Sequence, residues 1–170
     1  MYQHILVAVD GSPTSNLALL EAAKLASAGA TLRLVTAVED PSWAMPLEPG
    51  AYDQDLLHSS LLKGAKDILE RAKTLLKHKG IDARTHLLDL AELPGTSIPS
   101  ALLAEAQSWP ADVIVIGTHG RRGINRLLMG SVAETLIRSS NTPVLLVRAA
   151  GSKDEAGNHE ATSGEQADAV

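Results

Sequence analysis

Residues 113–139 read VIVIGTHGRRGINRLLMGSVAETLIRS, and this stretch decides the fold class. Its first four residues, Val113 to Ile116, are β-branched and continuously apolar, as in a parallel strand that is buried on both faces. A glycine-bearing loop follows, and a helical pattern begins near Ser131. A buried strand that leads through a loop into a helix is typical of α/β sheets. We therefore expect this strand to lie inside such a sheet.

The loop places glycines where a phosphate could approach the backbone. Gly117, Gly120 and Gly123 follow at three-residue intervals, and Gly130 directly precedes Ser131. Glycine has no Cβ, so backbone N–H groups can turn toward an anion. The start of a helix adds further N–H groups and a partial positive charge. Together these features favour phosphate binding, although each glycine alone is more simply explained by turn geometry.

The helix that follows the loop has its own start signal. Residues 131–134, SVAE, form a capping-box pattern, in which the Ser131 oxygen and the Glu134 side chain satisfy free amides at the helix start. Capping accounts for Ser131 without any ligand. Both interpretations of this serine, as a cap and as a phosphate ligand, therefore stay open.

Two commoner nucleotide motifs do not fit the loop. A dinucleotide fingerprint requires G-x-G-x-x-G, whereas the first spacing here is G-x-x-G. A Walker loop requires G-K-[ST], and no lysine precedes Ser131. The glycine spacing therefore disfavours a nicotinamide or flavin oxidoreductase.

The rest of the chain alternates between strands and helices. The patterns predict strands at 5–9, 31–38, 83–88, 113–116 and 143–148, and helices at 12–28, 55–79, 97–109 and 131–139. This alternation predicts an α/β fold with a five-stranded, mainly parallel, doubly wound sheet in the order 3-2-1-4-5 and helices on both faces. Ligands in such sheets bind at the carboxyl ends of the strands that flank the switch point, here the first and the fourth. Asp10 leaves the first strand and Gly117 leaves the fourth, so the candidate site joins residues about a hundred positions apart.

The spacing Gly117-x2-Gly120-x9-Gly130-Ser131 resembles the ATP-binding signature of the universal stress protein family. The resemblance extends from residues 5–12, ILVAVDGS, to residues 143–147, PVLLV, and covers about residues 2–149. It implies an ATP-binding regulatory module for stress responses, whose nucleotide occupancy controls loop order and the choice of a signalling partner. ATP would arrive with Mg²⁺ on its phosphates. The alternative is a slow ATPase or phosphotransferase that uses the same pocket.

The resemblance and the predicted switch point together give a set of nucleotide-binding candidates. They are Ala8, Val9, Asp10, Ala37, Ile116, Gly117, Gly120, Gly130, Ser131 and Val132. Asp10 could accept from a ribose hydroxyl or a base edge, or it could simply bond turn amides. By the resemblance, Ala37 is where strand backbone meets the adenine. We assign no catalytic residue, because His119 has no visible carboxylate partner, and no metal ligands, because the histidines are scattered.

Composition excludes several classes of protein. The formal net charge of −5 argues against a nucleic-acid binder. The chain has no cysteine, which fits a reducing compartment, and its first apolar run is too short for a signal peptide or a membrane span. We expect a cytoplasmic protein without a membrane partner. It would have one domain at 1–149 and a disordered acidic tail at 150–170, where one lysine faces five acidic residues.

Two loops and the last strand complete the expectations. The loop from Pro41 to Asp53 could cover a bound base or could tuck onto the domain. The connection from Asp89 to Ser97 is longer than in similar proteins, and its role is open. The apolar strand that includes Val144 to Val147 would lie at an edge of the sheet. Pairing with a second copy would cover this edge, so we expect a homodimer, as is common among similar proteins.

Overall fold

The computed structural model describes residues 2–26, 29–39, 53–118, 120 and 129–149. Its elements are, in chain order, β1 (His4–Ala8), α1 (Pro13–Leu25), β2 (Thr31–Val38), α2 (Gln54–Lys77), β3 (Ala83–Asp89), η2 (Leu90–Glu92), α3 (Ile98–Ser108), β4 (Val113–Gly117), α4 (Ser131–Ser139) and β5 (Val144–Val147). The predictions for residues 41–52 and for the tail at 150–170 fall outside the described residues. None of the described helices combines the length and the apolar character that a membrane span requires.

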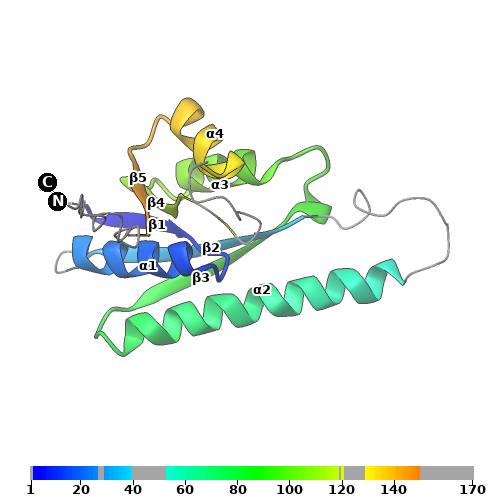
Figure 1. Cartoon of the computed structure of the whole chain (residues 1–170), viewed down its shortest axis with the longest axis horizontal. Coiled ribbons are helices and arrows are strands. Elements are labelled where there is room, and N and C mark those ends of the chain that lie inside the picture. The colour runs from blue at the N-terminus through cyan, green and yellow to red at the C-terminus, as the bar shows by residue number, and fades with distance from the viewer. Residues whose placement is uncertain (1, 27–28, 40–52, 119, 121–128, 150–170) are drawn as a thin grey trace, which may run out of the picture.

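The five strands form one parallel sheet in the order β3-β2-β1-β4-β5, which confirms the predicted topology (Figure 1). β1 lies at the centre, where Val7 is in register with Leu34 of β2 and with Val115 of β4. Each of these residues is buried, because helices cover both faces of the sheet. The order reverses at β1 and β4, so the switch point lies between these two strands.

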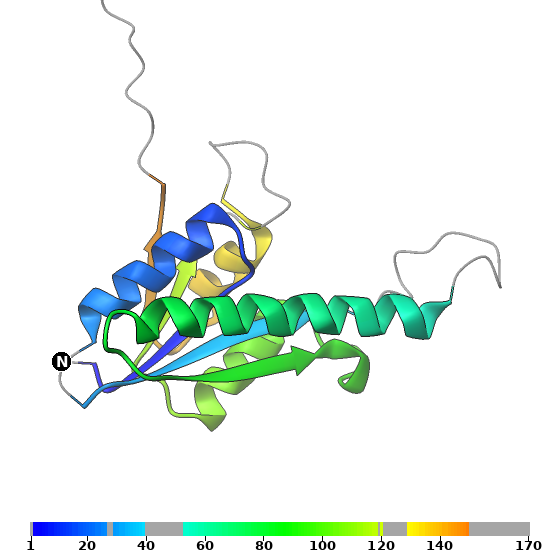
Figure 2. The ribbon, with the colours of Figure 1, turned by 90° about the horizontal axis from the view of Figure 1, so that it is seen from below.

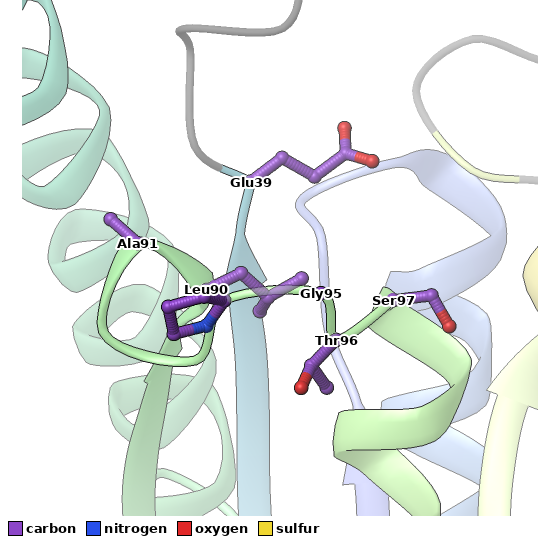
Figure 3. A pocket seen from close by; sticks show the side chains of 7 residues that line it. Glu39, Leu90, Ala91, Gly95, Thr96 and Ser97 are labelled. Carbon is purple, nitrogen blue, oxygen red and sulfur yellow. The ribbon is translucent and has the colours of Figure 1, made fainter.

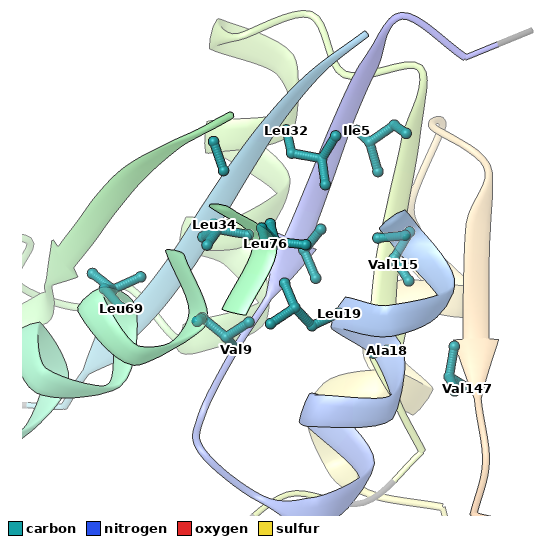
Figure 4. Packing of buried hydrophobic residues seen from close by; sticks show 14 of the residues in the cluster. Ile5, Val9, Ala18, Leu19, Leu32, Leu34, Leu69, Leu76, Val115 and Val147 are labelled. Atoms are coloured by element: carbon teal, nitrogen blue, oxygen red, sulfur yellow. The ribbon is translucent and has the colours of Figure 1, made fainter. Parts of the chain in front are cut away.

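Two apolar layers hold the helices to the sheet. α1 and α2 cover one face, and the side chains that fill this layer come from both helices and from alternate strand positions (Figure 4). α3 and α4 cover the other face around Leu6, Ile114 and Leu136, all of which are fully buried. The layers are built from aliphatic side chains, in keeping with a chain that has no phenylalanine.

Side-chain caps fix the start of three helices. Ser12 accepts from the Ser15 amide, and Ser97 from the Ser100 amide, so the predicted starts of α1 and α3 are confirmed. Asp53 caps α2 by accepting from the Leu56 amide at 3.0 Å. This helix thus begins one residue before the predicted Asp55 and ends at Lys77, ahead of Gly80, whose φ is +74°.

The buried face of α2 agrees in part with the predicted one, since Ala65, Ile68 and Ala72 are buried as expected. Apolar residues recur at helical spacing in this segment and predict one buried face, made of Leu57, Leu61, Ala65, Ile68, Ala72 and Leu75. Leu75 is nevertheless 37% exposed, whereas Leu69 and Leu76 are buried. Leu57 and Leu61, also expected on that face, are exposed because the first half of the helix extends beyond the strands (Figure 2). The sequence predicts the helical spacing of the apolar residues in α2, but it does not show how much of the helix the sheet covers.

The amino ends of β1 and β4 are tied together by Asp112. Its Oδ2 accepts from the backbone amides of Gln3 at 2.7 Å and His4 at 2.8 Å. These two hydrogen bonds, that of His4 foremost, lower the pKa of the Asp112 carboxyl below its usual 3.8. The ionised carboxylate therefore stabilises the native state.

We expect Asp112→Asn to lower the free energy of unfolding at pH 6. Because the folded pKa is depressed, the carboxylate contributes its stabilisation above about pH 3.8 and loses it as the pH falls through the folded pKa. The difference in the free energy of unfolding between wild type and Asp112→Asn should thus narrow below pH 3.8. Urea unfolding at pH 6 and pH 3 measures it, with Asp67→Asn on the exposed side of α2 as the control. A gap that is independent of pH would contradict this assignment.

Candidate functional site

The turns after β1 and β4 meet at the carboxyl edge of the sheet. A Cβ added to Gly120 would lie 2.8 Å from Oδ2 of Asp10, so the two loops are in direct contact at this point. The sheet order requires this meeting, because β1 and β4 are parallel neighbours. The structure therefore brings Asp10 and Gly120 together, as the predicted switch point required.

Gly117 is needed for packing, whether or not a ligand is bound. A Cβ at this position would lie 2.8 Å from the backbone carbon of Thr14 and 3.0 Å from the amide nitrogen of Ser15. Contacts this short are not tolerated, so only glycine lets the first turn of α1 approach the end of β4. The close approach of α1 accounts for this glycine more directly than phosphate binding does.

Asp10 organises the turn between β1 and α1. Its Oδ1 accepts from the Ser12 amide at 2.9 Å, and its own amide donates to Oγ of Ser15 at 3.1 Å. Ser12 and Ser15 are both buried, and Ser12 Oγ also lies 3.3 Å from Oγ1 of Thr14. Asp10 therefore does form hydrogen bonds within the turn, as one of its two interpretations predicted, while its role toward a nucleotide stays a prediction.

The predicted capping box at the start of α4 is wrong. The N-cap is Gly130, whose backbone is extended (φ −67°, ψ 146°), and Ser131 is the first helical residue. The start shifts because the Gly130 amide donates to the Thr118 carbonyl at 2.8 Å while the Gly130 carbonyl accepts from the Glu134 amide at 3.0 Å. A serine inside the helix no longer has the backbone conformation from which a side chain caps.

Because of this shift, the amino-terminal end of α4 is suited to binding an anion. Within the described residues no side-chain hydrogen bond caps the helix, so the amides of Ser131, Val132 and Ala133 have neither an intrahelical acceptor nor a capping oxygen. Gly130 adds no Cβ in front of them. The bond from Gly130 to Thr118 holds this helix end beside the loop that carries Gly120. An anion could bind here through backbone amides and the helix dipole.

The remaining candidates lie around this point with different degrees of burial. Ala8, Val9 and Ile116 are buried at the ends of their strands, and Val132 and Ala37 are half-buried. The Val9 amide donates to the Val35 carbonyl at 2.8 Å, and its carbonyl accepts from the Thr36 hydroxyl. The backbone amide and carbonyl of Val9 are therefore engaged in hydrogen bonds to β2. Ala37 lies one residue before the carboxyl end of β2.

A pocket of about 230 Å³ opens beside the carboxyl ends of β2 and β3. Its lining residues are Glu39, Leu90, Ala91, Pro94, Gly95, Thr96 and Ser97. In Figure 3 the Glu39 side chain extends over the pocket from the end of β2, and Ser97 lies across from it at the start of α3. The pocket was not predicted. Its signal in the sequence was the long connection from Asp89 to Ser97, for which we had no role.

The described residues contain no group of three histidine, aspartate, glutamate or cysteine side chains that could hold a metal ion. His119, Gly123 and the loop arginines at 121, 122 and 126 lie outside the described residues.

The fold is that of a doubly wound α/β protein, and the candidate site lies at its switch point. The sequence profile of the Universal stress protein family matches residues 1–148. The Universal stress protein MJ0531 of Methanocaldococcus jannaschii is 30% identical over 87% of this chain and 83% of its own. On this evidence the chain belongs to the universal stress protein family.

Two solved structures of similar proteins contain bound nucleotides. A universal stress protein in complex with cAMP is 29% identical, with a TM-score of 0.62 over 88% of this chain and 99% of its own. The universal stress protein from Archaeoglobus fulgidus in complex with dAMP is 28% identical, with a TM-score of 0.60 over 86% and 98%. Both are similar to this chain along nearly their whole length.

We expect Gly117→Ala to lower the free energy of unfolding by about 1–3 kcal/mol, because the new methyl group overlaps the first turn of α1. Gly64→Ala is the matched control. Gly64 lies in α2 with nothing within 4 Å of an added Cβ, so this change should stabilise by about 0.5–1 kcal/mol. Urea unfolding measures both. Equal effects of the two substitutions would contradict the close approach described for Gly117.

Proposed function

We propose that this protein binds an adenine nucleotide, with ATP and Mg²⁺ as the physiological form, and acts as a regulatory module in a stress response. The observation that carries the proposal is the start of α4, which presents backbone amides without a side-chain cap next to the contact between Asp10 and Gly120. The similar proteins that hold cAMP and dAMP support an adenine nucleotide as the ligand.

The charges of the site give the ligand one orientation. Two carboxylates, Asp10 and Glu39, lie at the ends of β1 and β2, where they would repel phosphates but can accept from ribose hydroxyls or an amino group. The phosphates then lie at Gly130, Ser131 and Val132. The nucleoside extends past Ala37 toward the pocket beside Glu39, where Leu90 and Pro94 provide apolar contact.

Magnesium fits this arrangement as a companion of the phosphates. Since no metal-binding group of three side chains exists among the described residues, the phosphates would supply most of its ligands. The carboxylate nearest the glycines, Asp10, is engaged by the Ser12 amide, which favours a binding role over that of a general base. Occupancy of the site would order its loops and so change which signalling partner binds.

We expect Gly130→Asp to weaken binding of AMP and ATP at least tenfold (~1.4 kcal/mol), because the new carboxylate faces the phosphates. Aspartate is a favoured N-cap, so the fold should keep its stability. Isothermal titration with each nucleotide measures the affinity.

The matched control is Gly130→Asn, which has nearly the same shape and also caps helices but carries no charge. It should bind more tightly than Gly130→Asp, because both side chains can cap the same amides and only the aspartate adds a charge that repels phosphate. Equal affinity of wild type and Gly130→Asp would remove the start of α4 from the site.

We also propose that the protein forms a homodimer through β5. The two edges of the sheet differ: β5 is entirely aliphatic, whereas β3, at the other edge, carries the exposed Arg84 and the half-exposed His86. Charged side chains discourage pairing at a strand edge, and an aliphatic edge is covered best by a second strand. β5 is therefore the edge suited to symmetric pairing.

Val144→Pro tests the dimer. The Pro143 and Val147 carbonyls accept from the amides of Ile114 in β4 and of Thr118 just after it, so by alternation the amide of Val144 points to the open edge. Proline removes that donor without removing a bond to β4. We expect the variant to be monomeric in sedimentation velocity at concentrations where wild type is dimeric. Far-UV circular dichroism confirms that it is folded. A folded variant that remains dimeric would exclude β5 pairing.

A further inference from the structure

One side of the pocket is a wall formed by residues 90–97, and a nearly buried carboxylate lies before it and another after it in the chain. Asp89 comes directly before this segment, and Glu105 lies two turns into α3, the helix that follows it. We propose that Asp89 and Glu105 are positioning residues, which hold the pocket in its binding shape before a ligand arrives. The part of the proposal that concerns affinity rests on the proposed nucleotide-binding function, but the part that concerns pocket order does not.

Asp89 anchors the first end of the wall. Its Oδ1 accepts from the Ala91 amide at 3.1 Å, which fixes η2, and lies 3.0 Å from Nε2 of His58 on α2. The Asp89 side chain is only 11% exposed. One oxygen thus joins the end of β3 and the wall residue Ala91 to the helix on one face of the sheet.

Glu105 anchors the other end from the opposite face. It is 7% exposed, and its Oε1 receives two donors: the guanidinium of Arg33 on β2 at 2.5 Å and Nδ1 of His86 on β3 at 2.8 Å. A carboxylate is buried in a protein only where such partners compensate its lost hydration. The apolar contacts of α3 do not require a charge here, since Leu102 and Ala106 already pack on the sheet.

A second contact fixes the direction of α3. The Arg33 guanidinium lies 4.8 Å from the ring centre of Trp109, the C-cap of α3, and this ring also contacts His4 of β1. The far end of α3 is therefore held by β1, β2 and β3. Because the helix is continuous from Ile98 to Ser108, fixing its far end also fixes Ser97 and Thr96 at the pocket.

The wall itself has few internal restraints. The Thr96 amide donates to the Leu93 carbonyl at 3.0 Å, and Gly95 has a φ of +77°, but Leu93 is exposed. Leu90 is buried in the core, but Glu92 to Gly95 are all exposed, and a stretch with so little burial opens locally unless its ends are held. A wall that is already in place costs a ligand less ordering entropy on binding, so the two anchors should raise affinity without touching the ligand.

Hydrogen exchange on the full chain without nucleotide tests the anchors. In Glu105→Gln and in Asp89→Asn we expect exchange of the peptide that covers residues 90–97 to accelerate about tenfold, while peptides from β1 and β4 keep the wild-type rate. Glu21→Gln is the matched control. It removes one charge from an exposed ion pair on α1 and should leave the wall unchanged. Asp89→Ala, which also removes the acceptor for Ala91, should accelerate the wall further.

Two outcomes overturn the proposal: an unchanged wall in all three anchor variants, or acceleration spread evenly over the chain, which would mean a loss of global stability only. A titration with AMP adds a second measurement. We expect the dissociation constant to rise about fivefold in Glu105→Gln. If wild type does not bind AMP, the proposed function fails, while the exchange result still decides whether the anchors hold the wall.

Discussion

The close approach of α1 to the end of β4 is the constraint on which the rest of the site depends. Gly117 leaves room for the backbone of Thr14, and this contact sets the distance between the turn after β1 and the loop after β4. With α1 seated, Asp10 reaches Gly120, and its other carboxylate oxygen closes the turn on Ser12. The Thr118 carbonyl, next to Gly117, then holds the start of α4 through Gly130. The whole carboxyl edge is therefore built outward from one position that cannot carry a side chain.

The sheet and its switch point could be predicted because their signals are local. Apolar β-branched runs mark the strands, and the strand–helix alternation leaves few topologies for a parallel sheet. The meeting of Asp10 with the glycine loop followed from that topology, although the two segments are about a hundred residues apart. The family resemblance drew on the same glycines. The structure shows that packing alone accounts for one of them, Gly117.

Features that depend on contacts between loops could not be predicted. Gly130 and Ser131 are both acceptable N-caps, and a hydrogen bond to Thr118, twelve residues earlier, decides between them. The pocket arises from turn geometry after β3, where residues 90–97 read LAELPGTS and carry no recognisable binding motif. Glu105 gave no signal at all, because an acidic residue in a helix is usually exposed and its partners come from two separate strands.

The unlike edges of the sheet have a consequence for assembly. A copy joined through β5 would leave β3 as the outer strand on either side, and β3 presents Arg84 and His86. The charged Arg84 disfavours pairing of two such edges, and β3 offers no continuous aliphatic strand for a third copy to extend. A sheet formed by pairing two copies through β5 would therefore not extend to a third copy. The chain could thus expose the aliphatic strand β5 without forming filaments.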